Sequence, residues 1–551
     1  MAKTKLFSQL LRTWKQAQFA QSKSITDLQL PEFCEEMAHQ VKSINSSRRE
    51  FGRLLFGGVA GGVLWNTLNP TSSLAHPAPR ESLGKKVVVV GGGVAGLATC
   101  YYLKKQGIKC SLFEASKRLG GRIFTQYQFN SDGMFVERGG ELIDTNHEDL
   151  IELVEELGLE TEDFLEGSTK ESAVYHFGDQ LLRDSDVLKA FGPFSRNILK
   201  SQETLMVDGE IQLPTYHTVK TPELVALDQL SLQAYLDSMD GNTMGRVEPW
   251  LRELISVAYR GEYGLETHEQ SAINLVSFIG TETDEFKIFG ESDEAKRIKG
   301  GNSKLINALI KEIEGTPFQL ESELEHIKVT SSGAISLQFK SGSTTQEVVA
   351  DHVVLAIPFT VLRRIPGVFD LPLSRPKRRA IKELGYGTNS KLMLDFTSKF
   401  WQTSSPFSTR GVDIYTDGKA QQFWETSRLQ KGNSGVLTHF LGGERGATRN
   451  ADQIELALSA LTMIYGSSAK NQFTGKKVYH VWRKDPLFRG SYICPTPGQY
   501  TRLMGASSET ELNGKLHFAG EHTSLDYGGF MNGAVESAKR VCLELTSDLI
   551  K

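Results

Sequence analysis

"KKVVVVGGGVAGLATCYYLKKQGIKCSLFEA", residues 85–115, decides the fold of this chain. The uninterrupted apolar run from Val87 to Val90 is typical of a parallel strand buried on both faces. A G-x-G-x-x-G turn and a helical segment follow, and a second strand over 109–113 ends at Glu114, where dinucleotide-binding folds place a carboxylate for a ribose. This order predicts a bound dinucleotide far more strongly than an empty glycine turn. The predicted contacts are Gly91, Gly93, Val94, Ala95, Gly96, Glu114 and Ala115.

A second glycine turn, "SKRLGGRIFT", selects FAD among the dinucleotides. Gly121 and Arg122 in this turn could fold back on the same pyrophosphate, and the arginine could neutralise it. That pairing resembles the glutathione-reductase-like FAD proteins rather than the simple nicotinamide dehydrogenases. "DHVVLAIP" (351–358) is predicted as the returning strand of such a fold, and Leu324 as a backbone contact for the adenine edge.

Bulk properties describe an ordinary folded protein of more than one domain. A chain of 551 residues is too long for a single core. Its formal net charge of -4 gives no indication of nucleic-acid binding. The five cysteines (34, 100, 110, 494 and 542) include no C-x-x-C pair, so neither a disulfide framework nor a metal site is predicted.

The first eighty residues resemble an export signal. Arg48 and Arg49 precede a mild apolar run over 54–68, and Ser73 and Ala75 form a small-x-small cleavage site. The run is about 15 residues long, too short for a stable transmembrane anchor. We expect twin-arginine export to the periplasm or the extracellular space. Because the segment before the arginines is unusually long, a helix that docks on a cytoplasmic protein stays open as the alternative.

Seven motifs in order resemble the flavin-containing amine oxidases, a family of monoamine, polyamine and L-amino-acid oxidases. The resemblance covers roughly residues 84–545. Besides the first glycine turn, the motifs are "LGGR" (119–122), "ERGGELID" (137–144), "IKGGNSKLINAL" (298–309), "SKLMLDFTSKFW" (390–401), "WRKDPLFRGSY" (482–492) and "FAGEHTSLDYGGFMNGA" (518–534). The amine chemistry is implied by this resemblance alone.

The resemblance implies an α/β protein with a discontinuous, glutathione-reductase-like FAD-binding Rossmann domain. We assign this domain to 84–140, 296–372 and 480–551. A mixed-sheet substrate domain is predicted over 141–164 and 373–479, with one helix over 452–465. A helical domain is predicted over 165–290, and we expect a homodimer.

By the same resemblance, Lys391 holds a water near flavin N5, and Tyr492 and Phe530 form two aromatic walls. An exposed strand lysine is the less favoured alternative; burial among Leu392 and Leu394 would lower its pKa. The remaining cofactor contacts implied are Gly139, Gly140, Glu141, Leu142, Trp482, Gly520, Glu521, Gly529 and Met531. Glu521 would hydrogen-bond the ribityl chain, and a helix beginning near Phe530 would point its N–H groups at the flavin.

Noncovalent FAD is expected, because Ser491 occupies the position of the covalent linkage in monoamine oxidases and Cys494 lies three residues away. The implied reaction is hydride transfer from the carbon beside the nitrogen to flavin N5, followed by imine hydrolysis and reoxidation by oxygen to hydrogen peroxide. A quinone acceptor and a non-catalytic flavin-binding protein are the alternatives. Retention of Lys391, both aromatic walls and Glu521 argues against the latter.

The substrate is the least determined feature. Many L-amino-acid oxidases carry an arginine where this chain has Leu142, so Arg260 is our substitute anchor for a substrate carboxylate. Arg260 could instead pair with Glu262 or Glu253. Glu141 and Asp144 would suit the second ammonium of a polyamine. We favour L-amino acids, which yield 2-oxo acids and ammonia, over amines or polyamines, which yield aldehydes.

Overall fold

The computed structural model describes residues 84–165, 173–239, 245–403, 412–417 and 419–549. The predicted export signal and Cys34 lie outside these ranges. Residues 81–551 form one compact unit. Within the described ranges, every helix is too short or too polar to cross a membrane.

A five-stranded parallel sheet forms the first half of this unit. Its order is β11 (Phe318–Gln319), β2 (Cys110–Phe113), β1 (Val87–Val90), β15 (His352–Leu355) and β21 (Leu516–Phe518). These strands come from all three segments predicted to bind FAD. The predicted strand at 87–90 is confirmed, and the second begins one residue later than predicted.

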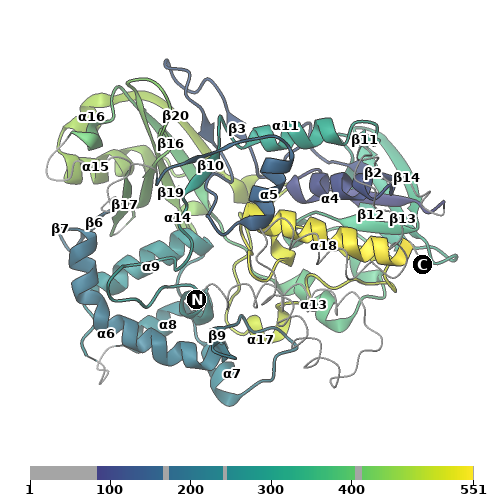
Figure 1. Cartoon of the computed structure of the whole chain (residues 1–551), viewed down its shortest axis with the longest axis horizontal. Helices are drawn as coiled ribbons and strands as arrows, with labels where there is room; N and C mark the ends of the chain where they lie inside the picture. Colours follow the sequence, from purple (N-terminus) through teal and green to yellow (C-terminus); the bar gives the residue numbers. More distant parts are fainter. Residues whose placement is uncertain (1–83, 166–172, 240–244, 404–411, 418, 550–551) are drawn as a thin grey trace, which may run out of the picture. The chain divides into compact units, whose positions relative to one another are not determined.

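Helices pack on this sheet because their small and aliphatic side chains match its apolar face. α18 (Met531–Leu549) lies alongside α4 (Val94–Lys105), as Figure 1 shows in yellow and purple. α11 (Ser303–Glu312) packs against α4 as well. Leu97, Val535 and Val541 are fully buried between these layers. An antiparallel sheet of β12 (Glu323–Val329), β13 (Ile335–Ser341) and β14 (Thr344–Ala350) completes this half.

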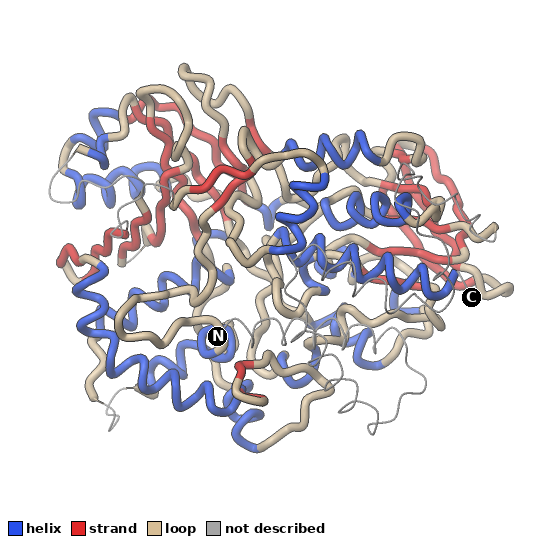
Figure 2. The backbone as a smooth tube through the Cα atoms, viewed as in Figure 1, coloured by secondary structure: helices blue, strands red, loops and turns tan. Residues whose placement is uncertain are grey.

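A seven-stranded mixed sheet forms the second half, and its strands form a separate red group in Figure 2. Its order is β20 (Phe473–Val481), β16 (Ser390–Phe396), β19 (Gly435–Leu441), β18 (Gln421–Glu425), β17 (Asp413–Thr416), β6 (Ala173–Phe177) and β7 (Gln180–Leu182). β6 and β7 come from the range predicted as helical. They are strands because Val174 and Phe177 reach the core through the pairing of β6 with β17.

Among its described residues, the rest of that range forms helices and the two short strands β8 (Met206–Val207) and β9 (Glu210–Ile211). It contains α6 (Asp184–Gln202), α7 (Pro222–Gln229), α8 (Leu232–Asp237), α9 (Pro249–Tyr263) and α10 (Ala272–Val276). α9 packs against β17, β18 and β19 and so reaches the substrate sheet. The helix predicted over 452–465 is confirmed as α15 (Gln453–Tyr465).

Residues 141–164 adjoin the FAD-binding segments rather than the seven-stranded sheet. α5 (Glu148–Glu156) packs on α18, and β5 (Thr161–Asp163) pairs with β10 (Lys296–Ile298). The other short elements are β3 (Thr125–Gln126), β4 (Val136–Glu137), α12 (Phe359–Leu362), α13 (Arg375–Glu383), α14 (Gly443–Gly446), α16 (Ser468–Gln472) and α17 (Tyr500–Leu503).

Candidate active site and cofactor site

The two glycine turns lie against each other, as predicted. Gly93 and Gly120 form a parallel bridge, and the Gly120 N–H donates to the Gly92 carbonyl at 2.8 Å. A Cβ on Gly96 would lie 1.9 Å from the Gly91 carbonyl oxygen, so only glycine fits there. The close turn leaves backbone without side chains at the carboxyl end of β1, which suits a pyrophosphate.

Glu114 stands at the end of β2 beside this turn. Its Oε2 accepts from the Gly92 N–H at 2.6 Å, and its Oε1 accepts from the Ser116 N–H at 2.7 Å. The Glu114 carbonyl accepts from Ser322, which brings the buried Leu324 of β12 close to the same strand end. The roles of Glu114 at a ribose and Leu324 at the adenine edge stay predictions.

Arg122 and Glu521 meet deeper in the site. Arg122 Nη1 donates to Glu521 Oε1 at 2.8 Å and to the Ser491 carbonyl at 2.5 Å. Glu521 Oε2 accepts from the Gly529 N–H at 2.9 Å and from the Ile493 N–H at 3.3 Å. Arg122 therefore points at Glu521 in this structure, and its predicted role at the pyrophosphate is untested. Glu521 joins three motifs that are remote in sequence.

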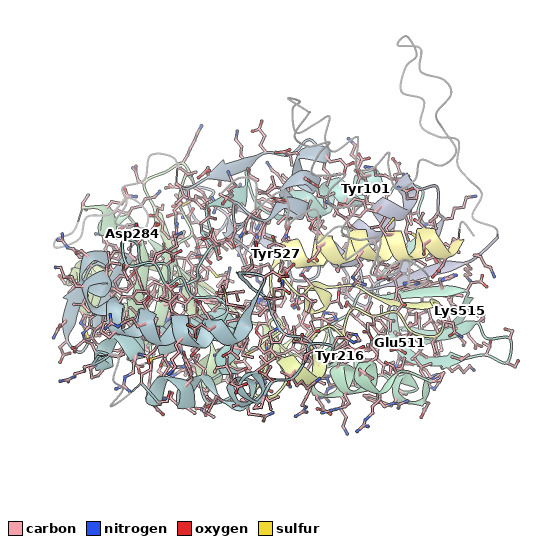
Figure 3. The ribbon with its side chains drawn as sticks, turned by 60° about the horizontal axis from the view of Figure 1, so that its bottom comes forward. Tyr101, Tyr216, Asp284, Glu511, Lys515 and Tyr527 are labelled. Atoms are coloured by element: carbon pink, nitrogen blue, oxygen red, sulfur yellow. The ribbon has the colours of Figure 1, made fainter. Side chains whose placement is uncertain are left out.

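α18 begins at Met531, in agreement with the helix start predicted near Phe530. Its first turn carries no acidic side chain, so nothing on the helix neutralises the partial positive charge of its N-terminus. Asn532 is fully buried, and its Nδ2 has no hydrogen-bond partner among the described residues. Tyr527, labelled in Figure 3, lies at this end of the helix. A free helix N-terminus beside an unsatisfied buried donor fits a cofactor edge that accepts hydrogen bonds.

Lys391 of β16 is buried, which excludes the exposed alternative. Its Nζ donates to the Gly139 carbonyl at 2.8 Å, to the Glu137 carbonyl at 3.3 Å and to Glu141 Oε2 at 2.8 Å. We predicted apolar surroundings from Leu392 and Leu394. The structure corrects this expectation, because the chain folds a carboxylate from another motif onto the ammonium.

Two buried carboxylates share the surroundings of Lys391. Burial raises the pKa of Glu137 to about 7, although its carboxyl group accepts hydrogen bonds from Asn302 and Thr125. Burial also disfavours the charged form of Glu141, but the Lys391 ammonium outweighs this effect and holds the pKa of Glu141 below its usual range. Glu141 is thus committed to Lys391 rather than free for a second ammonium of the substrate.

The predicted aromatic walls are neighbours. A Cβ on Gly529 would lie 3.4 Å from the Tyr492 ring, and Phe530 follows directly. The Tyr492 hydroxyl donates to the Gly261 carbonyl at 3.4 Å, and the Phe530 ring centroid lies 5.0 Å from that of His147. Tyr492 and Phe530 form no ring contact with each other among the aromatic pairs of the described residues, which is compatible with a substrate between them.

Trp482 and Met531 enclose the glycine pair of the "ERGGELID" motif. A Cβ on Gly139 would lie 2.9 Å from the Trp482 ring, and one on Gly140 would lie 2.9 Å from the Met531 sulfur. Trp482 is buried and donates from Nε1 to the Arg138 carbonyl at 3.1 Å. The predicted cofactor contacts of these motifs are therefore brought together at the start of α18. Leu142 is half-buried.

Arg260 and Asp144 both have protein partners. Arg260 Nε lies 2.8 Å from Glu266 Oε2, so the partner is neither Glu262 nor Glu253, the two that we had considered. Asp144 Oδ1 accepts from the Glu294 N–H at 2.9 Å, and burial raises the pKa of Asp144 to about 6. Neither side chain is free to bind substrate without giving up these contacts.

Two carboxylates beside the Tyr492 wall were not predicted from the sequence. Glu262 and Glu294 are half-buried, and their carboxylates make no hydrogen bond or ion pair among the described residues. Burial raises the pKa of Glu262 to about 8 and that of Glu294 well above its usual range. Burial, followed by Glu262, also raises the pKa of the Tyr492 hydroxyl. Glu262 was visible in "AYRGEYG", but the motif gave no sign that it would lie unpaired.

Comparisons with known proteins show the family of this chain. A family model described as flavin containing amine oxidoreductase matches residues 94–546. The L-amino-acid oxidase of Siganus canaliculatus is 24% identical over 491 residues, or 86% of this chain and 87% of the relative. The (S)-6-hydroxynicotine oxidase of Paenarthrobacter nicotinovorans is 24% identical over 459 residues, or 82% and 97%.

A solved structure confirms the predicted fold class. The cyclohexylamine oxidase from Brevibacterium oxydans IH-35A matches with a TM-score of 0.69 and 19% identity. The match covers 85% of this chain and 100% of that chain.

Proposed function

The chain belongs to the flavin-containing amine oxidoreductases, whose cofactor is FAD, and from this premise we propose that it oxidatively deaminates L-amino acids. The products would be a 2-oxo acid, ammonia and hydrogen peroxide. The structural observation that carries an oxidase function is the placement of the buried Lys391 and the Tyr492 wall around the free N-terminus of α18. The amino-acid assignment is supported by the relative named as an L-amino-acid oxidase.

The residues present fit FAD along its whole length. The turn around Gly91, Gly93 and Gly96 would hold the pyrophosphate, and Glu114 the ribose. Arg122, Glu521 and the first N–H groups of α18 would surround the flavin end. When bound, FAD supplies the two-electron acceptor for the C–H bond beside the substrate nitrogen.

The side chains of this protein then bind and orient the amine. Tyr492 and Phe530 would confine it between two apolar faces and exclude water from the reacting carbon. The N-terminus of α18 favours negative charge that develops nearby, and its N–H groups are already oriented before the reaction. Lys391 adds a second positive group on the side of β16. Hydrolysis of the released imine needs only water.

A second candidate, an amine or diamine oxidase, is favoured by Glu262 and Glu294, whose carboxylates are unpaired within the part of the chain that the structure describes. Burial of a carboxylate without a partner costs free energy, and a cationic group that binds between or beside these two carboxylates would reduce that cost. The amino-acid proposal, in contrast, requires a cationic anchor for the substrate carboxylate. Arg260 is paired with Glu266, and Arg428 donates to Asp413 at 2.8 Å. If either arginine binds the substrate carboxylate, it must also keep or give up its ion pair with the protein.

A product-resolved substrate screen separates the two candidates. The purified yellow protein is offered neutral, acidic and basic L-amino acids, a monoamine and a series of diamines, with peroxide measured by a coupled peroxidase. Formation of 2-oxo acid from L-amino acids supports the first candidate. Aldehyde from diamines with inert amino acids supports the second. If no amine reduces the flavin under anaerobic conditions, both are rejected. Reduction without reoxidation by oxygen would indicate another electron acceptor.

A further inference from the structure

The ammonium of Lys391 uses all three of its N–H donors on the protein. Two go to main-chain carbonyls at Glu137 and Gly139, and the third goes to the Glu141 carboxylate. The side chains of Lys391 and Glu141 are 7% and 3% exposed, so water does not screen the pair. A neutral amine has only two donors and could not satisfy all three acceptors. The geometry is therefore built for the charged lysine.

The turn that carries Glu141 also faces the cofactor site. Gly139 is covered by Trp482, and Gly140 by Met531 at the first position of α18. Asn302 Nδ2 donates to the carbonyls of Gly140 and Glu141, at 3.0 and 2.9 Å, which fixes the turn between β4 and the start of α11. The backbone of Glu141 is thus held in place by hydrogen bonds, which positions its side chain to pair with Lys391.

Charged, titratable and aromatic groups from four other segments lie around this pair. Lys391 has the larger effect in lowering the pKa of Glu141, and Arg297 of β10 lowers it further. Glu137 of β4, whose pKa burial raises to about 7, carries no negative charge while it is protonated. His480 of β20 faces Lys391, and burial lowers its pKa to about 4, so its ring is neutral. On the fourth side, Lys391 Nζ lies 5.0 Å from the centroid of the Trp424 ring of β18.

We propose that Glu141 is a positioning residue that keeps Lys391 protonated and fixed beside the flavin. Lys391 then acts as a permanent ammonium with a constant position. Together with the N-terminus of α18, it provides a second positive group near the cofactor, where negative charge accumulates on reduction. Glu141 acts only through Lys391 and touches no substrate. This role holds whichever amine the enzyme oxidises.

The holoenzyme of Glu141→Gln tests this inference without any substrate. Glutamine keeps the size of the side chain but removes the counter-charge, so the buried ammonium of Lys391 loses the carboxylate that stabilises its charged form. The visible spectrum of the bound flavin is titrated from about pH 6 to about pH 9. We expect an ionisation that is absent from the wild type. It should vanish in the double variant Glu141→Gln, Lys391→Met and be absent from Glu141→Asp, which keeps the charge.

Anaerobic reduction gives the second readout. Glu141→Gln should reduce its flavin about tenfold more slowly at neutral pH, and Glu141→Asp should recover most of the rate. Lys391→Met and the double variant should be equally slow, because Glu141 has no effect once the lysine is gone. Glu425→Gln is the matched control. It breaks a lysine–carboxylate pair with Lys399, which follows β16 in the chain and does not contact Glu141, and should leave the spectrum and rate unchanged.

Three results would overturn the inference. The first is a Glu141→Gln spectrum that titrates like the wild type together with an unchanged rate of reduction. The second is a new ionisation that persists in the double variant, because then it does not belong to Lys391. The third is a double variant clearly slower than Lys391→Met, which would give Glu141 a role of its own. If Glu141→Gln does not retain FAD, the rates of flavin reduction in Glu141→Asp and Lys391→Met are compared instead. A rate in Glu141→Asp as low as that in Lys391→Met would overturn the inference, and a rate near that of the wild type would support it.

Discussion

The guanidinium of Arg122 and the carboxylate of Glu521 form a 2.8 Å ion pair across 399 positions of the chain. The same carboxylate accepts from the backbone at Gly529, and the same guanidinium donates to the backbone at Ser491. One pair therefore connects the second glycine turn, the segment of the Tyr492 wall and the approach to α18. The cofactor site is held together where its three parts meet.

Breaking this pair should loosen the hold on FAD. Glu521→Gln leaves Arg122 charged but removes the stronger acceptor of the Gly529 and Ile493 N–H groups. A lost charge-assisted hydrogen bond costs about 1.5–3 kcal/mol, so FAD should bind about tenfold or more weakly. Measurement of Kd by flavin fluorescence after removal of the cofactor checks this. Glu544→Gln, a carboxylate that pairs with Arg540 at the far side of α18, should retain FAD normally.

Lys391→Met should slow flavin reduction or reoxidation about tenfold or more, while the protein stays yellow. The methionine keeps most of the volume of the side chain but removes the ammonium that pairs with Glu141 at 2.8 Å. Stopped-flow measurement of both half-reactions checks this prediction. The exposed Lys382→Met serves as the control. Wild-type rates for both half-reactions in Lys391→Met would rule out a role for the lysine in turnover.

Arg260→Ala tests the anchor of the amino-acid proposal. A buried substrate carboxylate needs a charge-assisted partner, and its loss costs about 2–5 kcal/mol. The kcat/KM for L-amino acids should therefore fall about thirtyfold or more, while a simple arylalkyl amine loses far less. Because Arg260 also pairs with Glu266, Glu266→Gln is the control for lost packing on α9. Undiminished oxidation of amino acids by Arg260→Ala would exclude this arginine as the anchor.

Glu262→Gln tests the second candidate. If a distal ammonium binds beside the Tyr492 wall, the variant should lose about tenfold or more in kcat/KM for diamines and leave monoamines almost unchanged. Glu253→Gln, on the opposite side of α9, is the matched control and should affect neither substrate. Equal losses for monoamines and diamines would indicate a general effect on the site instead of recognition of a second charge.

The same carboxyl group should leave a signature in the stability of the ligand-free protein. The pKa of Glu262 is about 8 in the fold against 4.5 as its ordinary value. The folded state therefore binds its proton more tightly than the unfolded state, and its stability falls as the pH rises from about 4.5 to about 8. Glu262→Gln should match the wild type near pH 4 and exceed it by about 1–3 kcal/mol near pH 8, allowing for residual solvent contact. Denaturant unfolding at the two pH values measures the difference; a constant difference would contradict the assignment.

We also propose export by a twin-arginine route. Arg48→Lys with Arg49→Lys should leave the protein in the cytoplasm with FAD bound, because this route transports folded chains that already hold their cofactor. Cell fractionation and the N-terminal sequence of the exported form check this prediction. An exported double variant would contradict it, as would a mature protein that keeps residues 1–75.

Local order along the chain was sufficient to predict the cofactor fold. The buried strand at Val87–Val90, the glycine turn and the acid at Glu114 are close in sequence, and their backbone requirements act over a few residues. The start of α18 after Gly528 and Gly529 followed from a similar short pattern, whereas the burial of Lys391 in β16 was expected from the family resemblance. The family motifs extended this prediction to the aromatic walls.

The tertiary structure alone decided which charges meet. Glu141 pairs with Lys391 and Arg260 with Glu266, while the carboxylates of Glu262 and Glu294, beside Tyr492, have no partner among the described residues. The state of a charged side chain depends on its burial and on partners that lie remote in the chain, and no spacing rule encodes either. For this reason the sequence by itself determined a flavin fold and the segments of its candidate site. Only the packing of separate segments determined the electrostatics on which the proposed choice of substrate depends.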